Sequence, residues 1–434
     1  MNKLVETGSD GCRKQPTQEE VLSPGYTKML DLQKQLGSHS GEGRHLLVFL
    51  DGTWNEDRTP IGEATPTNVL RMFHEIDKKP NPGKQPHIIA RYYRGVGNRQ
   101  DNKYLNRLWY GFNGEDEQRI RQAAFAGLYS DYKSVNDVIY IIGFSRGAAS
   151  ARLLARDLCK DGFPPNLEVE TRHYPNFLTG QIEARIVWVR RHNECADKTV
   201  FPKVKFLGCW DTVDAFVLPS RFPADDSKDK VARWFKNIAP RLLGKERFRG
   251  DENQIPQKVE QAVHCVAIDE TRNAFLPTLM PAAKNVEEVW FPGVHSDVGG
   301  GYGDNKLAGE AYDFMRVFLE KESKKENQID PISFNSKGKN SESYCFHYHG
   351  LNTGMERTKE FFGFGTNMRK IRVLNGAPGA KPKIHSSIFT VIGNGNVFAA
   401  NKKNKRTWRV TYDPYNFREF NDGFEIVDTE RRDL

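Results

Sequence analysis

Five short apolar-rich runs, each followed within two residues by a glycine, a proline or an aspartate, constrain the fold of this chain more than any other feature. Continuous runs of this length are typical of strands buried on both faces of a parallel sheet. Segments with helical periodicity separate them, which favours an α/β fold: a mostly parallel, doubly wound sheet with helices on both faces. The runs span residues 45–50, 88–93, 138–142, 204–210 and 289–291, and the helical patterns span 68–76, 118–132, 148–158 and 257–268.

Composition divides the 434 residues into three parts. Residues 1–43 are polar and are expected to form a flexible N-terminal extension. Residues 44–325 hold the α/β domain, with an insertion or lid candidate at 218–253. Residues 326–434 are expected to be a C-terminal extension of mixed structure. Smaller patterns indicate at most one helix in the N-terminal extension, near 26–36, a helix near 307–321, a loop over 321–343, and short strands near 384–392 and 408–412.

The charge balance favours anionic partners, since the net charge is +8 and the pI is about 9.0. No nucleic-acid motif accompanies this charge, so nucleic acid is not an expected partner. Six cysteines without CxxC pairing indicate free thiols in a reducing compartment. No signal-peptide pattern and no stretch of roughly 20 apolar residues is seen, which predicts a cytoplasmic location in the producing cell. Histidines and acids lack metal-site spacing, so no metal and no cofactor is predicted.

A GxSxG pentapeptide, residues 143–147, lies directly after one apolar run and directly before a helical pattern. In that setting the turn is so tight that the serine is strained and its hydroxyl is held above the sheet, and the flanking glycines avoid clashes. The following helix directs its first amides at a developing oxyanion. The pattern therefore predicts that Ser145 is a nucleophile in an α/β-hydrolase-like fold.

A base and an acid are expected after the serine in chain order. His295 is the best base among seven later histidines, because it follows an apolar run within the glycine-rich loop 292–301. Asp211 ends the strand 204–210 and is the preferred acid; Asp214 and Asp297 are the alternatives that the sequence leaves open.

The oxyanion hole is expected at two strand ends. One amide is that of Arg146, which follows the serine, and the other is that of Gly52 or Thr53, at the end of the first predicted strand.

The insertion contains a basic segment, residues 225–249, with apolar residues at helical spacing. Trp234 and Phe235 fall on its apolar side, and Arg233 and Lys236 are among the surrounding cations. A basic amphipathic helix of this kind suits an anionic membrane surface or a lid over the site. A helix that packs on the core with a solvated basic face fits the pattern equally well.

Several motifs together resemble the catalytic domain of type VI secretion phospholipase effectors, over about residues 45–320. They are LVFLDGTWN (47–55), TNV (67–69), YYRGVG (92–97), GFSRGAASAR (143–152), VKFLGCWDTV (204–213), HCVAIDETRNAFLP (264–277) and VWFPGVHSDVGGGY (289–302). The resemblance implies an α/β-hydrolase fold and phospholipase A activity, with the triad at Ser145, Asp211 and His295. It also implies an antibacterial effector, with an immunity protein or a secretion-apparatus component as partner and export to the target-cell periplasm or a membrane surface.

The expected function is a serine esterase or lipase that cleaves acyl esters, foremost those of glycerophospholipids, through an acyl-enzyme. Two alternatives stay open at this point. One is a carboxylesterase that acts on small soluble esters, and the other is a non-catalytic binding module on the same fold.

Overall fold

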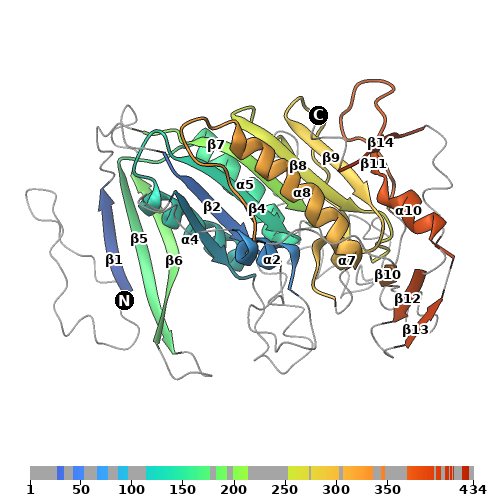
Figure 1. The fold of residues 1–434 in the computed structure, drawn as a ribbon. Helices are drawn as coiled ribbons and strands as arrows, with labels where there is room; N and C mark the ends of the chain where they lie inside the picture. Colours follow the sequence, from blue (N-terminus) through green and yellow to red (C-terminus); the bar gives the residue numbers. More distant parts are fainter. Residues whose placement is uncertain are drawn as a thin grey trace, which may run out of the picture.

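A computed structural model describes most of the predicted domain. It covers residues 27–33, 43–52, 66–76, 87–95, 114–175, 182–192, 199–213, 253–272, 275–302, 306–335, 344–347, 369–394, 397–401, 406–409, 411–412, 414 and 423–429. The centre of the fold is an eight-stranded sheet (Figure 1). Every described strand pairing within it is parallel.

Across the sheet, the strand order is β14, β11, β9, β8, β7, β4, β2, β3. In chain order the strands are β2 (His45–Leu50), β3 (Ile88–Tyr93), β4 (Val138–Phe144), β7 (Lys203–Trp210), β8 (Val259–Ala267), β9 (Val286–Phe291), β11 (Lys383–His385) and β14 (Glu425–Val427). The helices are α2 (Asn68–Glu75), α4 (Gly114–Asp131), α5 (Arg146–Lys160), α7 (His295–Gly299), α8 (Lys306–Lys324) and α10 (Ser387–Gly393).

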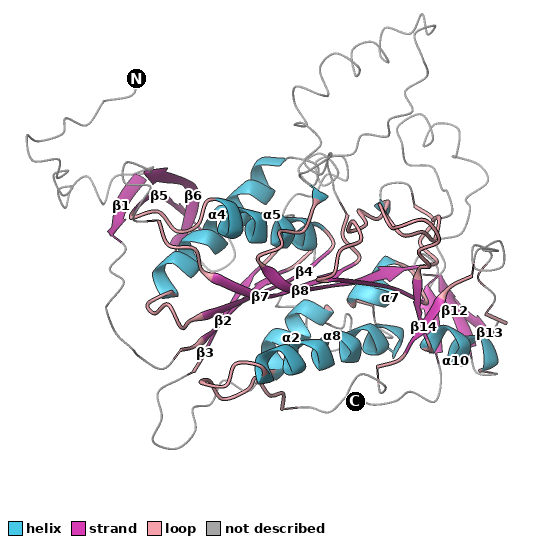
Figure 2. Cartoon of the chain, turned by 90° about the horizontal axis from the view of Figure 1, so that it is seen from above, coloured by secondary structure: helices cyan, strands magenta, loops and turns pink. Residues whose placement is uncertain are grey.

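Helices cover both faces of the sheet. Seen from above, α4 and α5 lie on one side, and α2, α7 and α8 lie on the other (Figure 2). Every residue of the central strands β2 and β4 is buried, because each face of the sheet meets a helical layer. This arrangement confirms the doubly wound α/β fold that the apolar runs predict.

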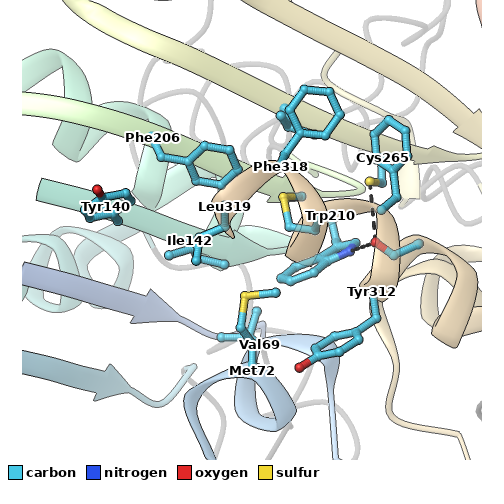
Figure 3. Packing of buried hydrophobic residues seen from close by; sticks show 14 of the residues in the cluster. Val69, Met72, Tyr140, Ile142, Phe206, Trp210, Cys265, Tyr312, Phe318 and Leu319 are labelled. Atoms are coloured by element: carbon cyan, nitrogen blue, oxygen red, sulfur yellow. Dashed lines mark hydrogen bonds between the residues drawn. The ribbon is translucent and has the colours of Figure 1, made fainter. Parts of the chain in front are cut away.

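The layer under α8 is closely packed. The indole of Trp210 lies against this helix and donates through Nε1 to the carbonyl oxygen of Ala311, over 3.1 Å (Figure 3). The Cys265 thiol is directed at the same carbonyl, and Tyr312 is fully buried nearby. Trp210 ends β7, so this packing anchors the strand whose next residue is Asp211.

Two of the predicted helices are wrong. Where a helix is predicted over 257–268, the chain forms strand β8 (Val259–Ala267), because this segment lies between β7 and β9 and Ala262 to Ala267 are all buried. Burial overrides a spacing of valines that also fits a helix. The helix predicted near 26–36 is replaced by strand β1 (Thr27–Gln33), which pairs antiparallel with β5.

Two small sheets were not predicted. One has the order β1-β5-β6, with β5 (Asn166–Pro175) and β6 (Ile182–His192). The other has the order β10-β12-β13, formed by β10 (Tyr344–His347), β12 (Val397–Asn401) and β13 (Arg406–Arg409). The strand predicted near 384–392 is instead the short β11 followed by α10.

The segment after residue 326 contributes to the main sheet, since β11 pairs with β9 and β14 pairs with β11. The boundary between the domain and the C-terminal extension stays a prediction, but the sheet runs across it. Among the described helices, none is long and apolar enough to cross a membrane.

Candidate active site

Ser145 occupies the turn between β4 and α5, with φ of 57° and ψ of −123°. A left-handed φ at a residue with a side chain is strained and persists only where the surroundings impose it. Its backbone N–H donates to the Trp210 carbonyl over 3.0 Å, and its carbonyl accepts from Val213 over 3.3 Å. These bonds to the neighbouring strand hold the turn in place.

The glycines on either side are required by close backbone approach. A Cβ on Gly147 would lie 2.1 Å from the Leu50 carbonyl oxygen, and one on Gly143 would lie 2.5 Å from the Gly147 carbonyl oxygen. No real Cβ contact is this short, so the GxSxG spacing follows from how tightly α5 approaches β2 and β4.

His295 is the first residue of α7, and its Nε2 lies 2.8 Å from the Ser145 Oγ. The imidazole contacts the rings of Phe144 and Phe275, with centroid distances of 4.6 and 4.8 Å. Its backbone N–H donates to Glu270 over 3.2 Å. His295 is therefore held by two aromatic contacts to its ring and by a hydrogen bond at its backbone.

Asp211 directly follows β7, and its Oδ2 lies 2.6 Å from the His295 Nδ1. The carboxylate accepts a hydrogen bond from the Nδ1–H, so the unprotonated Nε2 is left to accept one from the Ser145 hydroxyl. The other oxygen, Oδ1, accepts the Ala267 N–H over 2.9 Å. Ser145, His295 and Asp211 thus form one hydrogen-bonded chain at the carboxyl ends of β4, β9 and β7.

Arg369 completes this chain, although the sequence analysis did not single it out. Its Nη1 donates to Asp211 Oδ1 over 2.5 Å and its Nη2 to Oδ2 over 2.8 Å. Its side chain is 1% exposed, so this is a buried ion pair. The residue types next to Arg369 in the sequence give no local signal of such a contact.

Charge and burial act in opposite directions on the carboxyl group. Burial alone would raise the pKa of Asp211, but the Arg369 charge and the hydrogen bond from His295 outweigh it and hold that pKa well below its usual value. Burial lowers the pKa of His295, and the neighbouring Asp211 only partly offsets this effect. Both directions favour an ionised acid beside a neutral imidazole.

The sequence leaves Asp297 and Asp214 as alternative acids. Asp297 is buried at the start of α7, and its Oδ2 accepts the Val294 N–H over 3.1 Å. Asp297 is the third residue of α7, and its side chain caps the first turn by accepting from the N-cap residue Val294, whereas the described hydrogen bond of the His295 Nδ1 is with Asp211. Asp214 lies outside the described residues.

The end of β2 is organised by Asp51. Its Oδ2 accepts the hydroxyls of Thr67 and Tyr92, each over 2.7 Å. Its Oδ1 accepts the Gly52 N–H over 2.7 Å, so this amide would have to leave a hydrogen bond to serve an oxyanion. Thr53 lies outside the described residues, and Arg146 opens α5 beside Ser145.

A further supporting contact fixes the loop after Asp211. The Thr212 N–H donates to the His264 Nε2 over 3.0 Å, and the His264 Nδ1 lies 2.8 Å from Glu288. His264 belongs to β8 and is fully buried, so its hydrogen bond holds this loop against the strand.

The predicted lid and a possible metal site are the remaining features to place. Trp234, Phe235, Arg233 and Lys236 lie outside the described residues, as does the rest of the lid candidate except its last residue, Asn253. Within the described part of the chain, no group of three or more His, Cys, Asp or Glu side chains could hold a metal ion.

Two of the solved structures that resemble this chain are distant from it in sequence. A crystal structure of an uncharacterized protein from Pseudomonas aeruginosa shares 18% identity over 63% of this chain and 45% of that chain, with a TM-score of 0.34. The structure of the Tle1 effector bound to the VgrG spike from the type 6 secretion system shares 17% identity over 61% of this chain and 52% of that one, also with a TM-score of 0.34. This chain thus spans about half the length of each.

No curated protein sequence matches the chain. Residues 44–318 match the family described as "T6SS, Phospholipase effector Tle1-like, catalytic domain". The match covers well over half of the chain and confirms the resemblance drawn from its motifs. The protein therefore belongs to the Tle1-like family of type VI secretion phospholipase effectors.

Proposed function

We propose that the protein hydrolyses acyl ester bonds of glycerophospholipids, as a serine hydrolase of the phospholipase A type. The observation that carries this proposal is the hydrogen-bonded chain from the Ser145 Oγ through His295 to Asp211. Membership of a phospholipase effector family supports the lipid substrate.

In the proposed reaction, His295 removes the hydroxyl proton as the Ser145 Oγ attacks the acyl carbonyl carbon. The bond to the leaving lysophospholipid oxygen then breaks, and the imidazolium returns the proton to that oxygen. A water molecule, deprotonated by the same imidazole, attacks the acyl-enzyme and releases a fatty acid. Asp211 stays ionised throughout and stabilises the imidazolium.

The oxyanion of the tetrahedral intermediate needs two amide donors. The Arg146 N–H at the start of α5 is the proposed first donor. The second donor is the amide of Gly52 or of Thr53. The Gly52 N–H already donates to Asp51, which favours Thr53.

Activity requires a neutral imidazole. Because the pKa of His295 lies below its ordinary value of 6.5, most of its imidazole is still neutral when the pH falls to 6.5. We expect kcat/KM to decline only below that pH, at the pKa of the free enzyme.

Family membership also supports two proposals about partners and location. We propose that a component of the secretion apparatus carries the protein out of the producing cell and that an immunity protein restrains it. The basic segment 225–249 is proposed to meet anionic membrane surfaces.

Product analysis tests the proposed function. Purified protein is incubated with vesicles of defined phospholipids, and mass spectrometry follows the release of fatty acid and lysophospholipid. Ser145→Ala should lower the rate by at least about 10⁴-fold, because the acyl-enzyme cannot form. Ser150→Ala, which changes a buried serine of α5, the helix that follows Ser145, is the matched control and should retain activity.

Two other results would replace the proposal. Cleavage of short chromogenic esters but of no phospholipid would make the protein a carboxylesterase. Folded wild type that neither hydrolyses esters nor is labelled by a fluorophosphonate would be a binding module.

A further inference from the structure

We infer that Arg369 is a positioning residue for hydrolysis, which fixes the orientation and the ionised state of Asp211 and so sets the pH range in which His295 is an active base. This inference rests on the proposed function. Arg369 also lies beyond residue 318, where the family match ends, so the C-terminal part of the chain supplies a component of the site.

The contacts of Arg369 orient the carboxylate completely. Each Asp211 oxygen receives two donors: Oδ1 from Arg369 and the Ala267 N–H, and Oδ2 from Arg369 and His295. A carboxylate offers about four acceptor sites, so the described donors fill them. The carboxylate therefore cannot rotate away from the imidazole without losing a hydrogen bond.

The guanidinium is itself anchored to the backbone on both sides of the site. Its Nη1 donates to the Ala267 carbonyl at the end of β8 over 2.7 Å, and its Nη2 donates to the Phe275 carbonyl. Phe275 also packs on the His295 ring. One side chain thus connects the acid, the adjacent strand end and the segment that covers the base.

The charge of Arg369 has a consequence that a packing role would not have. His295 and Asp211 share a buried hydrogen bond, so the proton they take up on acidification belongs to the pair. Glu270 and Arg272 also face this pair, with Glu270 at the His295 backbone and bonded to Arg272. A cation bound to Asp211 opposes uptake of the proton by either member, so its removal must move protonation to higher pH.

The experiment compares pH profiles of phospholipid hydrolysis for the full chain and its Arg369→Gln variant. We expect kcat to fall by roughly 10²-fold, as for a misplaced catalytic group, with KM changed by less than about twofold. The acidic limb of kcat/KM should move up by about one pH unit. Arg369→Lys keeps the positive charge but cannot bind both Asp211 oxygens in the same forked geometry. Its acidic limb should therefore stay at the wild-type pH, and its kcat should lie between those of the wild type and Arg369→Gln.

The matched control is Arg44→Gln. Arg44 forms a similar forked pair with the buried Asp137, over 3.1 and 2.7 Å, at the opposite ends of the strands. This variant should lose stability and keep the wild-type pH profile. Arg369→Gln with a wild-type acidic limb, or Arg369→Lys with wild-type kcat, would overturn the inference.

An NMR titration separates this inference from the proposed function, because it needs no substrate. In protein with ¹⁵N-labelled histidine, the His295 signals are assigned by comparison with His295→Gln. Arg369→Gln should raise the protonation midpoint of His295 whether or not the protein hydrolyses lipid, and an unchanged midpoint would refute the electrostatic role. If Arg369→Gln does not fold, the kcat of Arg369→Lys is the test: a reduced kcat supports the inference, and a wild-type kcat contradicts it.

Discussion

Backbone strain gathers at the proposed catalytic residues. Ser145 and Asp211 have φ of 57° and 38°, and only one other described residue with a side chain, Asn375, has a positive φ. Each such residue costs on the order of 1–3 kcal/mol, and the neighbouring strands over-determine both positions through backbone hydrogen bonds. The strain directs the hydroxyl and the carboxylate toward the same imidazole.

The choice of acid can be tested at the residue scale. Asp211→Asn should lower kcat by about 10⁴-fold, because the amide cannot hold the imidazole in the required tautomer. Asp297→Asn keeps an oxygen that can accept the Val294 N–H, and we expect it to lose less than about tenfold. Steady-state kinetics on both variants, after circular dichroism has shown that they fold, measures the difference. The opposite ranking would move the acid to Asp297.

At the scale of elements, the site exists because parallel strands end at one edge of the sheet. Strands β4, β7 and β9 end just before Ser145, Asp211 and the loop to His295, and β8 between the last two supplies the Ala267 amide. Groups that are far apart in sequence meet there, as is general for α/β sheets.

The approach of α5 to β2 makes a prediction about Gly147. Gly147→Ala places a Cβ 2.1 Å from the Leu50 carbonyl oxygen, so the helix or the strand must move. The free energy of unfolding should fall by about 3 kcal/mol, with loss of hydrolysis. Gly309→Ala is the control: its Cβ meets nothing within 4 Å in α8, and helix propensity should stabilise it by about 0.5–1 kcal/mol. Urea unfolding of both variants measures the effects, and equal stabilities would contradict the close approach.

At the scale of the whole molecule, the C-terminal part and the preceding domain share a core. Ile384 of β11 is fully buried in a cluster with Val266 of β8 and Trp290 of β9. The sheet therefore depends on residues that lie far beyond the family match.

This shared core predicts one unfolding transition. Ile384→Ala should lower the free energy of unfolding by about 2–5 kcal/mol and shift the whole thermal transition, since a buried methylene cluster is lost. Differential scanning calorimetry measures it. Two separate transitions, with only the smaller one shifted, would mean that the C-terminal strands fold as an independent unit.

The sequence by itself determined five strands of the main sheet and most of the helices, and it singled out Ser145, His295 and a preferred acid, Asp211, with Asp214 and Asp297 left open. Apolar continuity, helical period and the GxSxG spacing are local properties, so they can be read along the chain. Their order, strand before each polar residue, also predicted that Ser145, Asp211 and His295 meet at one edge, and the structure brings them within hydrogen-bonding distance.

Only the tertiary structure decided the rest. Strand β8 follows from burial between two neighbours, which cancels its helical spacing. Arg369, Glu270 and His264 reach the site through contacts between segments distant in sequence. A buried charge is recognised as such only when its partner is known, because the free energy of an ion pair depends on distance and burial, and neither is written in the order of residues.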